Sequence, residues 1–442
     1  MLGTVALTLI VVSSIPLVLS LVIWSPGLIA ATIIPSQILL GGMERGSVLP
    51  GLRAGELVLG VCAACLLASP RWRWQRLGNI RLNTWMGLYV ATGFVVPLIS
   101  WRLHGHALSG DVVQAYAATG KAGLLYLVFA GLELSDTEVE GVLKAAFWSV
   151  VLSGVVAILQ VLHFAPVEAL LLEYFKGPHL YERLSGEASR ATGLAANWHS
   201  LGIEFVLALL IGSQLRRLCT GASARRTLAW GMGILVLALG TVRTLTSIVL
   251  FAGLLAVPVR NAMDRHGRRL VLWVSILLTV AAAVALAVIA SASRRNAYFT
   301  TILPASLYVR LYYWLFLYGP IIRSHALLGY GPFLPIVSAK SDDSQFVLLL
   351  LRGGFLTLTG WLVTVGRIAF WSHRETTNVA GVRAALAQNV FASTVALVAA
   401  SIMQSFFTYG GVVEFYWVLV AMLAARATRI PKEALVSATP PA

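Results

Sequence analysis

Long apolar stretches recur from one end of the sequence to the other, and short polar segments separate them. Most of these stretches are about 20 residues long, which is enough for an α-helix to span roughly 30 Å of membrane hydrocarbon. A membrane β-barrel would instead show shorter segments in which apolar and polar residues alternate. The pattern predicts 12 or 13 transmembrane helices, over residues 3–24, 27–41, 52–69, 83–101, 113–133, 142–162, 198–215, 227–241, 244–259, 269–291, 345–370, 386–404 and 410–427.

The first two stretches need interpretation. The run from Leu2 to Trp24 has no basic segment before it and no clear small-residue cleavage site, so we interpret it as a retained helix rather than a signal peptide. The stretch 27–41 is short, and the sequence leaves open whether it crosses the membrane or lies at its surface.

Composition supports a membrane protein. Hydrophobic residues make up 58% of the 442 residues and charged residues only 12%, about half the share found in soluble domains. We therefore expect an all-α fold with one polytopic transmembrane domain over residues 1–430. A disordered cytoplasmic tail would follow at 431–442, and no room remains for a large soluble domain.

The distribution of basic residues predicts an orientation. A net charge of +15 would suit a nucleic-acid-binding protein, but arginines concentrate in short loops beside helix ends, as the positive-inside rule requires. We therefore expect no nucleic acid as a partner, and we place the loops 70–82, 216–226 and 260–268 in the cytoplasm. Two long segments, 163–197 and 292–344, then face the periplasm of a bacterial inner membrane. Long loops in compact folds are usually functional.

Charged residues inside apolar stretches are the first candidates for function. Glu56, Lys121 and Arg352 are the main cases, and Glu204 and Glu414 are weaker ones. A charge at mid-membrane costs about 2.5–3.5 kcal/mol on insertion scales, so such residues usually face a cavity or one another. Lys121 and Arg352 would thus either line the floor of an outward-facing cavity or form internal ion pairs that only fix packing.

The end of the second long segment carries the sharpest group of polar residues. Gly329-Tyr-Gly331 is followed by Asp342 and Asp343, directly before an apolar helix. Either carboxylate could cap the helix by accepting hydrogen bonds from its free N–H groups. Alternatively, it could act as a general base toward a bound hydroxyl.

Three patches follow one another in a recognisable order. The first runs from Arg190 through Gly193 and Asn197 to His199, and the second centres on Arg243. The third combines Arg310, the Gly329-Tyr-Gly331 turn, the Asp343-Ser344 pair and a glycine eleven residues beyond Asp343, at position 354.

In these patches the chain resembles the O-antigen ligase and O-antigen polymerase superfamily of bacterial membrane glycosyltransferases. The resemblance covers roughly residues 185–370 and the arrangement of spans with two large outward loops. Trp198 replaces a common proline, His199 a common asparagine and Ser344 the usual asparagine, and the serine before Arg243 is missing. Ligases tend to carry histidine where this chain has Asp343, so the polymerase branch is favoured.

The resemblance implies a GT-C-like architecture and a periplasmic active site that transfers glycan from an undecaprenyl-pyrophosphate carrier to an acceptor sugar hydroxyl, with inversion. No cofactor or metal would be needed, because fixed arginines can stabilise the departing pyrophosphate. Other expected partners are membrane lipid, a chain-length regulator and a flippase. The expected catalytic residues are Asp343, Arg190, Arg243 and Arg310, and the expected substrate-binding residues are His199, Lys121, Arg352, Asp342, Gly329 and Gly331.

Other functions stay open at this stage. An O-antigen ligase would transfer the glycan to lipid A-core, and a peptidoglycan-type polymerase would share the architecture. A transporter or lipid-linked glycan flippase would also have charges inside the membrane, but it would usually show internal repeats, and none is evident. A membrane scaffold without chemistry is the last alternative. His199 and His325 stand alone in the sequence, so we do not expect either to bind a metal.

Overall fold

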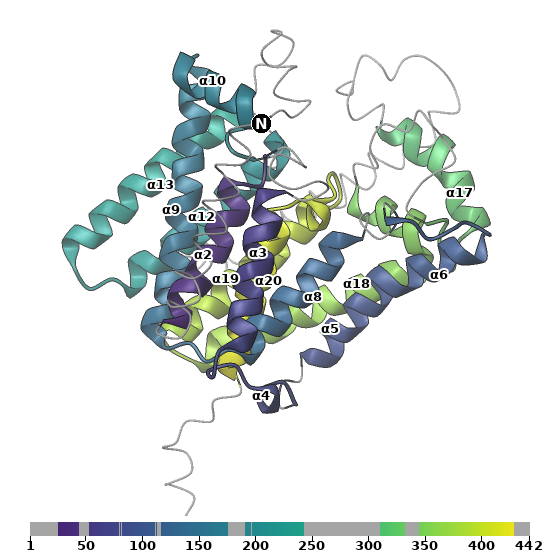
Figure 1. Ribbon diagram of the computed structural model, residues 1–442, viewed down its shortest axis with the longest axis horizontal. Helices are drawn as coiled ribbons and strands as arrows, with labels where there is room; N and C mark the ends of the chain where they lie inside the picture. Colours follow the sequence, from purple (N-terminus) through teal and green to yellow (C-terminus); the bar gives the residue numbers. More distant parts are fainter. Residues whose placement is uncertain are drawn as a thin grey trace, which may run out of the picture.

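The computed structural model describes residues 25–43, 53–78, 80, 82–110, 112, 116–175, 191–195, 197–242, 310–331 and 344–427. Within these ranges the regular structure is helical and no β-strand occurs (Figure 1). Five helical segments are long and apolar enough to cross a membrane: Asn83–Leu103, Asp136–Val161, Trp198–Leu218, Gln345–Asn378 and Gly381–Ala400. The chain is therefore an all-helical protein of the membrane type, as its hydrophobic pattern predicts.

Ten of the predicted stretches coincide with helices, and the stretches 3–24, 244–259 and 269–291 lie outside the described residues. The first of the ten, 27–41, forms a helix that packs against its neighbours in the bundle. The ten stretches correspond to α2 (Pro26–Leu39), α3 (Ala54–Ala68), α5–η1–α6 (Asn83–Val90, Ala91–Val95 and Val96–Leu103), α8 (Ala117–Gly131), α9 (Asp136–Val161), α12 (Trp198–Leu218), α13 (Ala222–Val242), α18 (Gln345–Asn378), α19 (Gly381–Ala400) and α20 (Val412–Ala427).

Short helices occupy parts of the connecting segments. The segment 163–197, expected as a long loop, begins with a helix, α10, and the segment 292–344 contains the short helices η3 and α17. These short elements are α4 (Trp74–Gly78), α10 (Ala165–Tyr174), η3 (Tyr313–Tyr318), α17 (Gly319–Ser324) and η4 (Phe406–Thr408).

Helix α20 forms the centre of the bundle (Figure 1). Its residues from Val412 to Arg426 are all buried, and it packs against α8, α19 and α2. A helix that is apolar around its whole circumference is expected to be enclosed by other helices. The outer helices show the opposite feature, because large apolar side chains such as Trp230 and Phe370 are exposed on them. Membrane hydrocarbon would cover these side chains.

Ion pairs at one end of the bundle hold two of the predicted cytoplasmic segments together. Arg71 donates two hydrogen bonds to the carboxylate of Glu138, at 2.7 and 2.6 Å. Arg426, near the end of α20, pairs with Asp136. Because both carboxylates belong to the first turn of α9, the loop after α3 and the end of α20 lie at the same end of the bundle. Which side of the membrane this end faces stays a prediction.

Candidate functional site

The structure describes part of the expected site. Arg190, Arg243, Asp342 and Asp343 lie outside the described residues, so the predicted convergence of three arginines stays untested. The other six expected residues are described: Lys121, His199, Arg310, Gly329, Gly331 and Arg352.

A break in α18 is the central feature of the site. The sequence predicts one continuous helix over 345–370, but Gly353 and Gly354 have non-helical backbone angles inside α18. Gly354, with φ 63° and ψ −159°, adopts a conformation that is essentially restricted to glycine. The first part of α18 therefore ends at Arg352, and the second part begins at Phe355.

The turn around Gly329 and Gly331 fills this break. The N–H groups of Tyr330 and Gly331 donate to the Leu351 carbonyl, at 2.6 and 3.3 Å. In return, the N–H groups of Phe355 and Leu356 donate to the carbonyls of residues 326 and 327, at 2.8 and 3.3 Å. Backbone groups freed by a broken membrane helix need such partners, because hydrocarbon offers none. Two segments that are separate in the sequence thus form one structural unit.

Close contact explains why this unit needs glycine. A Cβ added at Gly329 would collide with the backbone of Gly353 and Gly354, and one added at Gly354 would collide with the Leu327 carbonyl. The turn is also held from α6, where the Ser100 hydroxyl donates to the Gly329 carbonyl at 2.6 Å.

Arg352 lies directly before the break and lines a small cavity. Its guanidinium carbon is 5.7 Å from the centroid of the Tyr116 ring. Thr119, Gln345 and Thr408 also line this cavity, which therefore lies between α8, the start of α18 and η4. Arg352 thus lines a cavity, which is one of the two arrangements that the sequence leaves open for Arg352 and Lys121.

The geometry at Lys121 favours the other interpretation. The Lys121 Nζ atom lies 2.6 Å from Glu414 Oε1 and 3.8 Å from Glu56 Oε1. The Glu414 side chain is 0% exposed, and Glu56 and Lys121 are mostly buried. Helices α3, α8 and α20 each supply one member of this cluster, so the ion pairs fix the packing of three helices.

A second buried carboxylate lies beside this cluster. Glu204, on α12, is 1% exposed and packs against Gly411, whose N–H donates to Glu414 at 2.7 Å. Among the described residues, no hydrogen-bond partner reaches Glu204 Oε2. The sequence marked Glu204 and Glu414 only as weak candidates, and the fold brings them together.

His199 belongs to the same region, through two residues that sequence reasoning missed. Its Nε2 atom is 3.4 Å from Gln404 Nε2, and the Tyr409 hydroxyl donates to Gln404 Oε1 at 2.9 Å. Gln404 ends one predicted apolar stretch and Tyr409 directly precedes the next, where a polar residue is ordinary, so no sequence signal distinguishes them.

His325 stands alone in the sequence, but in the structure it has aromatic neighbours. Its ring centroid is 4.7 Å from that of His104 and 5.2 Å from that of Tyr330. Trp101 and His106 stack beside them at 4.0 Å. The described residues contain no group of three His, Cys, Asp or Glu side chains that could hold a metal ion. What the cluster offers is a partly exposed group of aromatic faces beside the Gly329–Gly331 turn.

Fold and site together define a helical membrane protein in which charged and polar groups gather around the start of α18 and the segment 401–411. No protein-family model matches the sequence, and no curated protein is similar to it.

Replacing a buried glutamate by glutamine is expected to affect stability differently at Glu414 and at Glu204. Glu414→Gln removes the main counterion of Lys121, and we expect a loss of about 3 kcal/mol, at the lower end for a broken buried pair because Glu56 remains. Glu204→Gln removes a buried negative charge that has no ion-pair partner in the described part, so we expect little loss or a gain in stability. Thermal unfolding of the purified variants in detergent measures both effects. Equal losses would contradict this assignment of the ion pair.

Proposed function

We propose that this chain is an envelope polysaccharide polymerase, a membrane glycosyltransferase of GT-C-like architecture in the bacterial inner membrane. It would transfer glycan from an undecaprenyl-pyrophosphate-linked donor to an acceptor sugar hydroxyl at the periplasmic face. The observation that carries the proposal is the docking of the Gly329–Gly331 turn into the break at Gly353 and Gly354. The Gly329–Gly331 turn and Gly354, which belong to the same family-like patch, are then in direct contact.

Distance along the chain supports a common site for Asp343 and Arg352. Asp343 immediately precedes Ser344, the N-cap of α18, in the sequence. Arg352 is eight residues further on, about 12 Å along the helix axis. A sugar residue and a pyrophosphate fit within such a span.

The proposed reaction assigns one role to each kind of residue. Asp343 takes the proton of the acceptor hydroxyl while its oxygen forms a bond to the anomeric carbon. The bond from that carbon to the pyrophosphate breaks on the opposite face, which inverts the configuration. Arg190, Arg243 and Arg310 stabilise the negative charge of the departing pyrophosphate, since guanidinium groups match phosphate oxygens with two hydrogen bonds.

Aromatic faces give the same site a means of holding sugars. Trp101, His106 and Tyr330 are partly exposed beside the turn. Their flat rings suit the C–H faces of sugar rings, so the acceptor glycan would lie over them. His199 would lie further along the same end of the bundle.

A transporter of lipid-linked glycans is the second candidate, and two observations favour it. Transporters commonly bind substrates at broken helices, and they carry ionisable residues within the membrane. Helix α18 is broken, and the cluster around Lys121 is buried among α3, α8 and α20.

Reconstitution separates these functions. The purified protein is placed in liposomes with a fluorescent undecaprenyl-pyrophosphate oligosaccharide. A polymerase lengthens the glycan on its carrier. A ligase leaves the glycan length unchanged and transfers the glycan only when lipid A-core is added. A transporter changes only the accessibility of the donor to an external quencher. We expect lengthening without added lipid A-core. Accessibility that changes at constant glycan length would instead support the transporter.

A further inference from the structure

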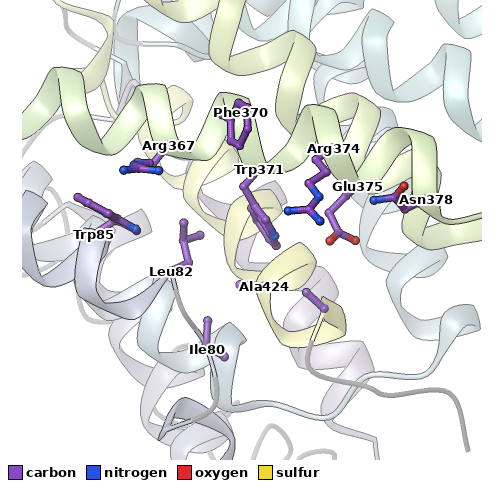
Figure 2. A pocket seen from close by; sticks show the side chains of 11 residues that line it. Ile80, Leu82, Trp85, Arg367, Phe370, Trp371, Arg374, Glu375, Asn378 and Ala424 are labelled. Carbon is purple, nitrogen blue, oxygen red and sulfur yellow. The ribbon is translucent and has the colours of Figure 1, made fainter. Parts of the chain in front are cut away.

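A second cavity lies far from the Gly329–Gly331 turn, at the opposite end of α18. Its volume is about 500 Å³. Helix α5 supplies Trp85, the end of α18 supplies Arg367 and Arg374, and the end of α20 supplies Ala424. Figure 2 shows these side chains around one space, with both arginines and Trp371 extending into it from α18.

The charge of this cavity is positive. Glu375 is its one acidic lining residue, and it is paired with Arg383 at 2.5 Å. Arg367 lies over the Trp85 ring, 4.8 Å from its centroid, which fixes the guanidinium at the cavity wall. In the part of the chain that the structure describes, no carboxylate lies within ion-pair distance of Arg367 or Arg374. Two guanidinium groups therefore line this cavity without an ion-pair partner among the described residues.

The start of α5 adds to this positive potential. Leu82 lines the cavity and immediately precedes Asn83, the first residue of the helix. The positive end of the helix dipole thus lies at the cavity wall, which favours an anion there.

An exposed apolar stripe leads from the cavity along α18. Leu356, Val363 and Phe370 follow one another at intervals of seven residues, which is about two helical turns, so they share one face. All three are exposed, and Phe370, at 66%, also lines the cavity. Arg367 and Arg374 lie three residues before and four residues after Phe370, and hence on the same face. One helix face therefore carries an apolar track that ends at two arginines.

We propose that this cavity binds one anionic phospholipid, with its phosphate between Arg367 and Arg374 and an acyl chain along Leu356, Val363 and Phe370. A soluble phosphate would use only the arginines, whereas the adjoining apolar track matches the hydrocarbon of a lipid. Basic pockets between membrane helices commonly bind phospholipid head groups in this way. The site is separate from the proposed glycosyltransferase site and does not depend on it.

Thermal stability with added lipid tests the proposal. The full-length protein is purified in detergent, stripped of lipid, and titrated with phosphatidylglycerol, phosphatidylcholine or inorganic phosphate. We expect phosphatidylglycerol to raise the unfolding temperature in a saturable way, because a ligand that binds only the folded state stabilises it. Phosphatidylcholine and inorganic phosphate should have little effect at the same concentrations.

Paired substitutions locate the effect. Arg367→Gln with Arg374→Gln should weaken the apparent affinity for phosphatidylglycerol by about tenfold or more, since two charge-assisted contacts are lost. Arg216→Gln with Arg226→Gln removes the same charge from exposed positions and should leave the affinity unchanged. These control positions lie at the same end of the bundle, where Arg217 contacts Gln388 of α19 at 3.1 Å. Arg374→Gln alone, on an exposed residue, gives a second variant should the double variant fold poorly.

Three results would overturn the proposal. Equal stabilisation by phosphatidylcholine would mean that the site does not distinguish the charge of the lipid head group. Equal stabilisation by inorganic phosphate would mean that the site binds a free anion. Equal weakening in the control variant would mean that only the overall charge matters.

Discussion

Replacing Asp343 by asparagine is expected to abolish chain extension while protein level and binding of the lipid-linked donor stay largely intact. Asparagine keeps the shape of the side chain, but it cannot accept a proton from a sugar hydroxyl. General-base catalysis typically contributes 10²–10⁴-fold in rate, so we expect a loss of about this size. The measurement is the rate at which purified protein lengthens a lipid-linked oligosaccharide.

The neighbouring carboxylate provides the control. Asp342→Asn makes the same chemical change one position away and should have a milder effect, because the resemblance places the functional residue at position 343. If Asp343→Asn extends chains at a near-normal rate, Asp343 serves only as part of the helix start. The base must then be sought elsewhere, and His199 is the next candidate.

Replacing Gly354 by alanine should be the most damaging of the small substitutions in α18. The backbone conformation of Gly354 costs a residue with a side chain about 1–3 kcal/mol, and the new Cβ would also meet the Leu327 carbonyl. We therefore expect roughly 3 kcal/mol or more of lost stability, measured by thermal unfolding, together with loss of activity.

Gly366 in the same helix is the matched control. It has regular helical geometry and open space around it, so alanine there should be neutral or stabilising by up to about 1 kcal/mol. Equal unfolding temperatures for Gly354→Ala and Gly366→Ala would contradict a non-helical backbone conformation at Gly354, and with it the break in α18.

The helices could be predicted from the sequence because hydrophobicity over about 20 residues determines whether a segment can span a bilayer. The break in α18 could not be predicted in this way. Gly353 and Gly354 do not interrupt the apolar run, and what bends the chain there is the Gly329–Gly331 turn, which comes from a distant part of the sequence. The family-like spacing places Gly329, Gly331 and Gly354 in one patch, but it does not indicate that they are in contact.

In the candidate site, too, the sequence predicts individual residues but not the contacts between them. The sequence identified Lys121 as a costly charge inside a span, but its partners Glu56 and Glu414 come from helices far away along the chain. Whether such a charge faces a cavity or a counterion depends on how the helices pack, which periodicity does not determine. The contact of Gln404 with His199 and that of His325 with His104 were missed for the same reason, because each joins residues far apart in the sequence.

The proposed polymerase activity can be measured as the length of the glycan on a lipid-linked donor, after incubation with the purified protein and no other enzyme. We expect a ladder of products that grow by whole repeat units with time and that stay attached to the carrier. A donor that keeps its original length under conditions in which the folded protein binds it would contradict the proposed polymerase.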